Sequence, residues 1–275
     1  LSEDTKAELN ARFTLIYTGQ RRLARNLLRD VVGRYNGSIF GLAWSFFNPL
    51  LLLTVYALVF TVAFKAQWPG GGEVQGKGYF AIMLFTGMVV HGFFAECLTR
   101  SPGVIVGNTS YVKKVVFPIE VLPVVAVGSA LFHSLISLSV LLVGVLALRQ
   151  SLPATALLVP LVLLPLVLLA QGVTWLLAAL GVYLRDIAHS TGLLAVVLSF
   201  ISPVFYPTST LPAPYSQWIY LNPLTWVMET TRAVLVHGNP PHWGQWLLAL
   251  SASALACWLG YWSFQKARSG FADVL

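Results

Sequence analysis

Long apolar runs separated by short polar segments divide this chain of 275 residues. A helix needs ~20 apolar residues to cross a hydrocarbon core of about 30 Å, and several runs reach that length. Period-two alternation, the mark of barrel strands, is absent, so helices are expected to cross the membrane. The pattern predicts six spans, at about 38–64, 79–98, 121–148, 156–184, 191–206 and 243–264.

The composition agrees with an all-α integral membrane protein. Hydrophobic residues make up 57% of the chain and charged residues only 10%, whereas a soluble domain carries roughly 25% charged residues. The net charge of +7 comes from basic residues that flank the apolar runs, which indicates membrane topology and not nucleic-acid binding. With six spans and the N-terminus inside, most lysines and arginines fall on inner segments, so both termini are predicted to be cytoplasmic.

The segments outside the spans fall into three parts. Residues 1–37 are expected to be a cytoplasmic N-terminus, 38–265 the transmembrane domain and 266–275 a cytoplasmic tail. Within residues 20–34 the leucines share one helical arc and most arginines the next, which predicts an amphipathic helix on the membrane surface with its arginines facing lipid headgroups. A soluble surface helix is the alternative.

The stretch 207–236, before the last span, does not read as a seventh span. Its most apolar part, Trp218 to Met228, is too short and is interrupted by Asn-Pro. A re-entrant helical hairpin fits better. Glu229 and Arg232 lie one helical turn apart and can pair. The pair either neutralises a helix that enters the membrane or latches a gate.

Motifs for catalysis or metal binding are missing from the sequence. It contains no HExxH, GxSxG or Walker motif, and its histidines show no ligand spacing. We therefore expect no catalytic residues and no cofactor or metal bound by this chain. His133 lies near a span centre, where a hydrogen-bonded packing role is favoured over a proton relay. Glu96 and Glu120 are expected at the inner interface.

Aromatic residues form two stripes on the first span. Phe40, Trp44 and Phe47 share one face of the predicted helix, and Tyr56 and Phe60 lie with Phe64 on nearly the opposite face. One stripe is expected to face lipid or another helix. The other can offer ring faces to sugars, and the sequence does not distinguish them.

Three stretches together resemble the membrane permeases of ABC exporters for bacterial polysaccharides, which carry O-antigen, capsule or teichoic acid. They are RYNGSIFGLAWSFFNPLL at 34–51, YVKKVVFPIEVLPV at 111–124, and SPVFYPTSTLP with YLNPLTWVMETTR at 202–232. Their order and spacing agree with the family over nearly the whole chain, and the match to O-antigen permeases is the strongest.

The resemblance implies a homodimer in the bacterial inner membrane that works with two separate ABC ATPase subunits, which bind the ATP and Mg²⁺. The substrate would be a lipid-linked polysaccharide. The segment 108–118 would be a coupling helix that docks on the ATPase, and 207–236 a gate on the outer side. The alternatives are an ABC permease for drugs or lipids, and a membrane-embedded enzyme of glycan or lipid assembly.

The resemblance also implies roles for three sets of residues. The ATPase-coupling set is Asn108, Tyr111, Lys113, Lys114, Phe117 and Pro118. The channel and entrance set is Arg34, Tyr35, Trp44, Phe47, Tyr56 and Phe60. The gate set is Phe205, Tyr206, Tyr215, Trp218, Tyr220, Glu229 and Arg232.

Overall fold

A computed structural model describes residues 26–27, 29–31, 33, 40–63, 65, 68–69, 72–109 and 118–275. Within these ranges all regular secondary structure is helical, as predicted. Five helical segments in the described part of the chain are long and apolar enough to cross a membrane: Trp44–Val62, Gly78–Arg100, Val121–Ala147, Ala154–Tyr183 and Trp243–Arg268. The protein is therefore a multi-pass helical membrane protein.

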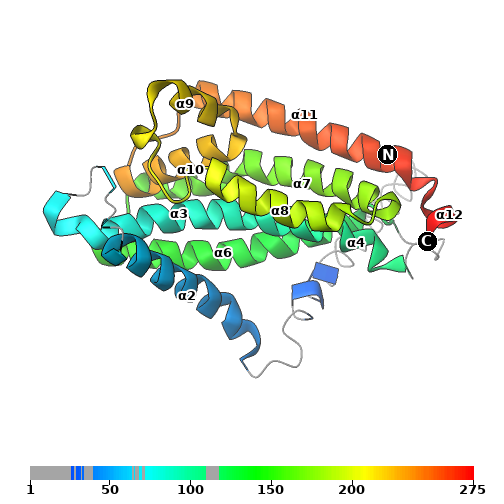
Figure 1. The fold of residues 1–275 in the computed structure, drawn as a ribbon, viewed down its shortest axis with the longest axis horizontal. Coiled ribbons are helices and arrows are strands. Elements are labelled where there is room, and N and C mark those ends of the chain that lie inside the picture. Colours follow the sequence, from blue (N-terminus) through cyan, green and yellow to red (C-terminus); the bar gives the residue numbers. More distant parts are fainter. Residues whose placement is uncertain are drawn as a thin grey trace, which may run out of the picture.

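Apart from α2, the long helices lie roughly along one axis, and short helices cover the two ends (Figure 1). We call the end that carries α9 and α10 the hairpin end, and the opposite end, with α4 and α12, the α4 end. The long helices are α2 (Trp44–Leu58), α3 (Gly72–Arg100), α6 (Val121–Arg149), α7 (Val159–Tyr183), α8 (Ile187–Ile201) and α11 (Trp243–Arg268). The short ones are α4 (Gly103–Val106), α9 (Ala213–Trp218), α10 (Pro223–Arg232) and α12 (Phe271–Val274). Single turns of 3-10 or π-helix extend several of them, at Gly41–Ala43, Val59–Ala63, Ala154–Leu158, Thr208–Thr210, Ile219–Leu221 and Ala233–His237.

The predicted fifth span differs most from the structure. The apolar run predicted a span over 191–206, but α8 begins at Ile187 and ends at Ile201. Its 15 residues give a length of about 22 Å, less than the hydrocarbon core. The chain then leaves the helix, and Ser202 adopts an extended backbone. The helix begins directly after the polar residues Arg185 and Asp186.

Helix α3 forms the centre of the protein. Phe80, Met83 and Leu84 on α3 are almost fully buried, and so are Leu141 on α6 and Leu235 after α10. In contrast, Ser45 is the only buried residue along the whole of α2, every residue of which the structure describes. In Figure 1, α2 lies at one edge and runs obliquely to the other helices. Helix α2 therefore contributes little to the packing of its own chain.

Helices α7 and α11 approach each other most closely at glycines. A Cβ atom at Gly172 would lie 2.5 Å from the carbonyl oxygen of Ala256, and a Cβ at Gly260 would overlap the carbonyl oxygen of Gly172. Because lipid tails are as apolar as leucine, helices in a membrane gain most from close van der Waals contact, which small residues permit. The two glycines thus allow the backbones to touch.

The prolines of α7 are accommodated in two ways. Pro160 is the second residue of α7, where its missing N–H breaks no helical hydrogen bond. Pro165 lies inside the helix and deprives the Leu161 carbonyl of its usual donor. The indole Nε1 of Trp246, on α11, donates to that carbonyl at 2.9 Å. A polar group that would be costly in lipid is thereby satisfied by the neighbouring helix.

Only part of the predicted N-terminal amphipathic helix is described. Residues 26–27, 29–31 and 33 are helical. Val31 is buried, and Leu27 lies against Gly128 of α6, 2.5 Å from where a Cβ atom would be. Asp30 accepts a hydrogen bond from Arg100 at the end of α3. The segment thus packs on the α4 end of the bundle.

We expect Gly260→Ala to destabilise the protein by about 1–3 kcal/mol, because the added methyl group forces apart two packed backbones. The measurement is the thermal unfolding midpoint in detergent. Gly244→Ala, on the same helix, is the matched control, since no atom lies within 4 Å of its Cβ position. Equal midpoints for the two variants would contradict the role of the glycine contact.

Candidate functional site

The hairpin formed by α9 and α10 is held to the end of α8 by Asn222. The Asn222 side-chain oxygen accepts a hydrogen bond from the backbone N–H of Leu224 at 3.0 Å, which caps α10. Pro223 occupies the first helical position, where proline is favoured. The Asn222 amide nitrogen also donates to the Ser202 hydroxyl at 2.8 Å. One residue therefore starts a helix and fixes it to the preceding span.

Arg232, at the end of α10, is the largest fully buried side chain in the described structure, with 1% of it exposed. Its Nη1 donates to the Glu229 carboxylate at 2.7 Å, as their spacing predicts. Its Nε donates to the Met83 carbonyl at 3.1 Å and its Nη2 to the Val204 carbonyl at 3.4 Å. The Trp68 ring lies 4.4 Å from the guanidinium carbon. Arg232 thus joins α10 to α3 and to the segment after α8.

A second set of contacts joins helices at the hairpin end. The Tyr79 hydroxyl lies 2.9 Å from Nε2 of His237, and Arg149 at the end of α6 donates to the Val236 carbonyl. Partial desolvation of the His237 ring, with Arg149 nearby, lowers the pKa of His237. Gly238 adopts φ +74°, which suits glycine and ends the helical segment.

Two residues of the second aromatic stripe, Tyr56 and Phe60, are partly buried against other aromatic rings of the protein. Phe60 stacks on Phe205 with ring centroids 5.7 Å apart and on Phe80 at 6.1 Å. Tyr56 contacts Phe205 at 5.5 Å. Tyr206 donates its hydroxyl to the Phe200 carbonyl at 2.9 Å. Two of the predicted channel residues therefore meet a predicted gate residue.

Three predicted gate residues are exposed at the hairpin. Tyr215 and Trp218 on α9 are 65% and 70% exposed, and Tyr220 is 52% exposed. These rings have the amphipathic character typical of membrane interfaces.

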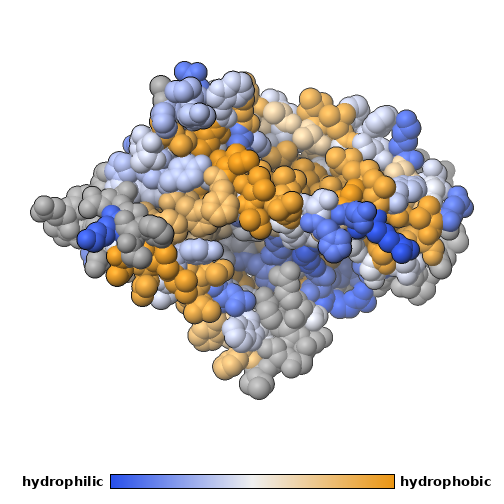
Figure 2. All heavy atoms as spheres, viewed as in Figure 1, coloured by the Kyte–Doolittle hydropathy of each residue, from blue (hydrophilic) through white to orange (hydrophobic). Residues whose placement is uncertain are grey.

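Two residues of the first aromatic stripe, Phe40 and Phe47, face outward. Phe40 and Phe47 are 58% and 54% exposed, and Phe40 makes edge-to-face contact with Trp44 at 5.7 Å. Figure 2 shows apolar side chains over α2 and α8, with hydrophilic side chains gathered in a hollow between them.

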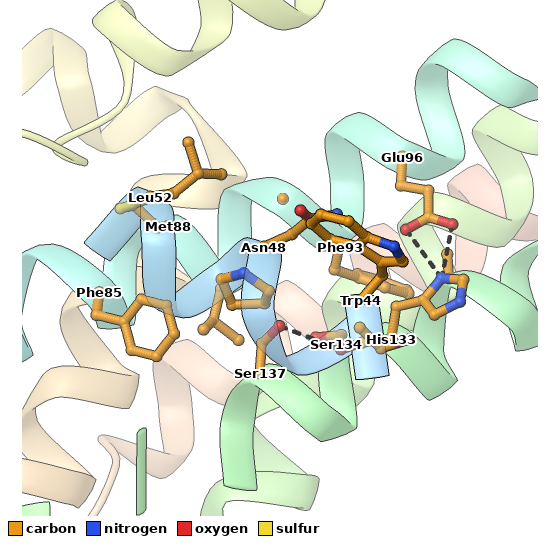
Figure 3. Close-up of a pocket in the computed structure, with 15 residues that line it drawn as sticks. Trp44, Asn48, Leu52, Phe85, Met88, Phe93, Glu96, His133, Ser134 and Ser137 are labelled. Carbon is orange, nitrogen blue, oxygen red and sulfur yellow. Dashed lines mark hydrogen bonds and ion pairs between the residues drawn. The ribbon is translucent and has the colours of Figure 1, made fainter. Parts of the chain in front are cut away.

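A cleft of about 270 Å³ lies between α2, α3 and α6. Trp44 and Asn48 reach it from α2, Glu96 from α3 and His133 from α6 (Figure 3). Nδ1 of His133 lies 3.1 Å from the Glu96 carboxylate. Arg100 pairs with the same carboxylate at 3.4 Å and with Asp30 at 2.7 Å. The hydrogen bond expected for His133 is present, and its partner is a carboxylate that the sequence did not identify.

The α4 end carries the segment predicted to couple to an ATPase. Asn108 caps the end of α4 by donating to the Val104 carbonyl at 2.9 Å, and Pro118 is exposed just before α6. Glu120 pairs with Arg268 of α11 at 3.1 Å. The remaining coupling residues, Tyr111, Lys113, Lys114 and Phe117, and the entrance residues Arg34 and Tyr35 lie outside the described residues. In the described part of the chain, no group of three or more His, Cys, Asp or Glu side chains could hold a metal ion.

The long apolar helices define a multi-pass helical membrane protein, and comparison with known proteins names the family. The family model for the ABC-2 type transporter matches residues 22–236. The chain therefore belongs to the ABC-2 type transporter family, as the sequence resemblance predicted.

Curated relatives extend the match to most of the chain. The chain is 30% identical over 250 residues to the O-antigen export system permease protein RfbA of Myxococcus xanthus, covering 90% of this chain and 92% of that protein. It is 26% identical over 249 residues to the protein of the same name from Klebsiella pneumoniae, with the same coverage of both chains.

We expect Arg232→Leu to destabilise the protein by about 2–5 kcal/mol, because it leaves the Glu229 carboxylate, 29% exposed, and two backbone carbonyls without their donor. Arg268→Leu, which breaks the more exposed pair with Glu120, should cost under about 1 kcal/mol. Thermal unfolding of the two purified variants tests the difference. Similar losses would show that the buried contacts of Arg232 add nothing beyond a surface pair.

Proposed function

We propose that the chain is the transmembrane subunit of an ATP-driven exporter that moves a lipid-linked, O-antigen-like polysaccharide across the bacterial inner membrane. The observation that carries the proposal is the similarity to O-antigen export permeases along 90% of the chain. The family pairs such permeases with an ABC ATPase, which would supply ATP hydrolysis. This chain itself would be no enzyme and would bind neither ATP nor Mg²⁺.

The proposed topology has six spans with both termini in the cytoplasm. Helix α8 serves as the short fifth span, and the hairpin from 207 to 236 re-enters the membrane on the outer side. In support, Arg185 and Lys266 lie at the α4 end together with Arg100 and Arg268, while Arg149 lies at the hairpin end. Positive residues favour the cytoplasmic side. The α4 end is then cytoplasmic.

The proposed assembly is a homodimer with an ATPase subunit docked on each copy. Helices α2 and α8 present large exposed apolar side chains, including Leu51, Leu58, Leu193 and Phe200. Such surfaces suit lipid or a second copy of the chain. The segment 108–118 joins α4 to α6, so movement of a docked ATPase would be transmitted to α3 and α6.

We predict that single cysteines report the proposed topology. In a background with Cys97→Ala and Cys257→Ala, Trp218→Cys should react with a membrane-impermeant maleimide in intact cells. Arg185→Cys should react only after the membrane is opened, because polar reagents do not cross the hydrocarbon core. The reverse pattern would overturn the orientation.

The function itself is tested with purified permease and ATPase. We expect the two proteins to co-purify, and a lipid-linked polysaccharide to stimulate ATP hydrolysis. The double variant Lys113→Glu, Lys114→Glu should lose most of this stimulation and export, because reversed charge at a docking interface repels the partner.

The double variant Lys65→Glu, Lys77→Glu, placed on the proposed outer side, is the charge-matched control and should retain stimulation. Absence of stimulation in the wild-type complex would argue against a polysaccharide exporter. Normal export by the Lys113→Glu, Lys114→Glu variant would argue against a coupling role for 108–118. It would leave the proposed export function standing.

A further inference from the structure

We propose that the cleft between α2, α3 and α6 is a sugar-binding subsite in which the Trp44 ring stacks on one glycan residue and Glu96 and Asn48 bind its hydroxyl groups. The inference rests on the proposed function, since it supposes a glycan in the pathway. The sequence placed Trp44 among the channel and entrance residues, and the proposal adds Glu96 and Asn48 as polar partners of the sugar.

The composition of the cleft suits a neutral polyol. Its polar lining combines the Glu96 carboxylate, the Asn48 amide and the hydroxyls of Ser134 and Ser137. A carboxylate offers about four acceptor sites and an amide offers both donors and acceptors, so vicinal hydroxyls can be bound as a pair. Indole faces pack against the apolar C–H face of a sugar ring. A volume of about 270 Å³ lies below the ~300–1,000 Å³ of most drug-sized sites, which suits a single ring.

The Glu96 carboxylate is held in position by its neighbours. His133 and Arg100 both interact with it, and Asp30 in turn holds Arg100. An ionisable side chain within a membrane span is costly and is usually retained where it faces a cavity with a function. Only 19% of the Glu96 side chain is exposed, so the carboxylate is fixed at the wall of the cleft instead of moving freely in water.

Other ligands fit the cleft less well. A phosphate would meet the negative Glu96, while Arg100 is already paired with two carboxylates. An acyl chain would cover the carboxylate and Asn48 without offering hydrogen bonds, which carries a desolvation cost. A sugar satisfies the polar wall through its hydroxyls and the Trp44 ring through its C–H face.

The position of the cleft agrees with an early point on an export route. Glu96 lies four residues before the end of α3 at Arg100, or about 6 Å along the helix axis. His133 lies twelve residues after the start of α6 at Val121, or about 18 Å. The subsite therefore sits in the half of the bundle nearer the α4 end, which we propose to be cytoplasmic.

The structure also separates the roles of the two aromatic stripes. Tyr56 and Phe60 are occupied by internal contacts with Phe205. Trp44 lines the cleft, and Phe40 supports its edge. The stripe that meets the glycan is accordingly the one that contains Trp44.

The first test measures protection of the cleft in cells. Ser134→Cys in the background without native cysteines is labelled with N-ethylmaleimide, in cells that make the host's lipid-linked polysaccharide and in cells that lack its synthesis. A partner ATPase that binds but does not hydrolyse ATP keeps the glycan in the pathway. We expect several-fold slower labelling when the glycan is present. Leu248→Cys, in a groove between α7, α10 and α11, should be labelled equally in both.

The second test measures export in a permease-deletion strain. Glu96→Gln and Asn48→Ala should each lower export about tenfold, the scale expected for loss of a hydrogen bond to a charged or desolvated group. Val55→Ala truncates an exposed side chain of α2 that does not line the cleft. This control should export normally.

The outcomes separate the subsite from the function. If the wild-type chain restores export but Ser134→Cys is labelled equally with and without glycan, or the cleft variants export normally, the subsite is wrong and the proposed function stands. If Val55→Ala loses as much export as Glu96→Gln, the loss does not depend on the cleft and the subsite is wrong. If the wild-type chain restores no export, the proposed function fails and the subsite with it.

Discussion

In a hydrocarbon environment, apolar side chains gain little by leaving lipid for protein, so this chain must hold its helices together by close approach and by polar contacts. Gly172 and Gly260 bring the backbones of α7 and α11 together. Trp246 satisfies the carbonyl that Pro165 leaves without a donor. Many of the other side chains on α7 and α11 are apolar and could face either lipid or protein. The specific arrangement of the bundle therefore depends on a small number of glycines and hydrogen-bonding side chains.

At the hairpin end, too, polar contacts hold the protein together, and Arg232 makes several of them. A buried guanidinium is costly unless its donors are satisfied, and this one is satisfied by Glu229 and by carbonyls of Met83 and Val204. All of these partners must be in place together, so the hairpin has one favourable position against α3. A hairpin that moved away would expose the charge to lipid. The buried contacts of Arg232 therefore fix the position of the hairpin as well as stabilise it.

The sequence predicted the features that depend on neighbouring residues. It did not predict the contacts between residues far apart in the chain. Apolar runs located five of the spans, and the spacing of Glu229 and Arg232 predicted their pairing, because these signals depend on near neighbours. The contacts of Arg232 with Trp68 and of Glu96 with His133 join residues far apart in the chain, and no periodicity reports them. The end of α8 was placed five residues too late, since apolar residues continue after the helix stops.

The loose attachment of α2 has a consequence for the range of molecules that the protein can accommodate. Little of α2 is buried against its own chain, and a π-helical turn at Val59–Ala63 follows it, a feature that often accompanies local bending. Tilting α2 therefore breaks few contacts within the chain. The width of the cleft beside Trp44 then depends on the protein or lipid that contacts the outer face of α2. In the proposed exporter, the assembled complex and its lipid surroundings would set selectivity by size, not the single chain.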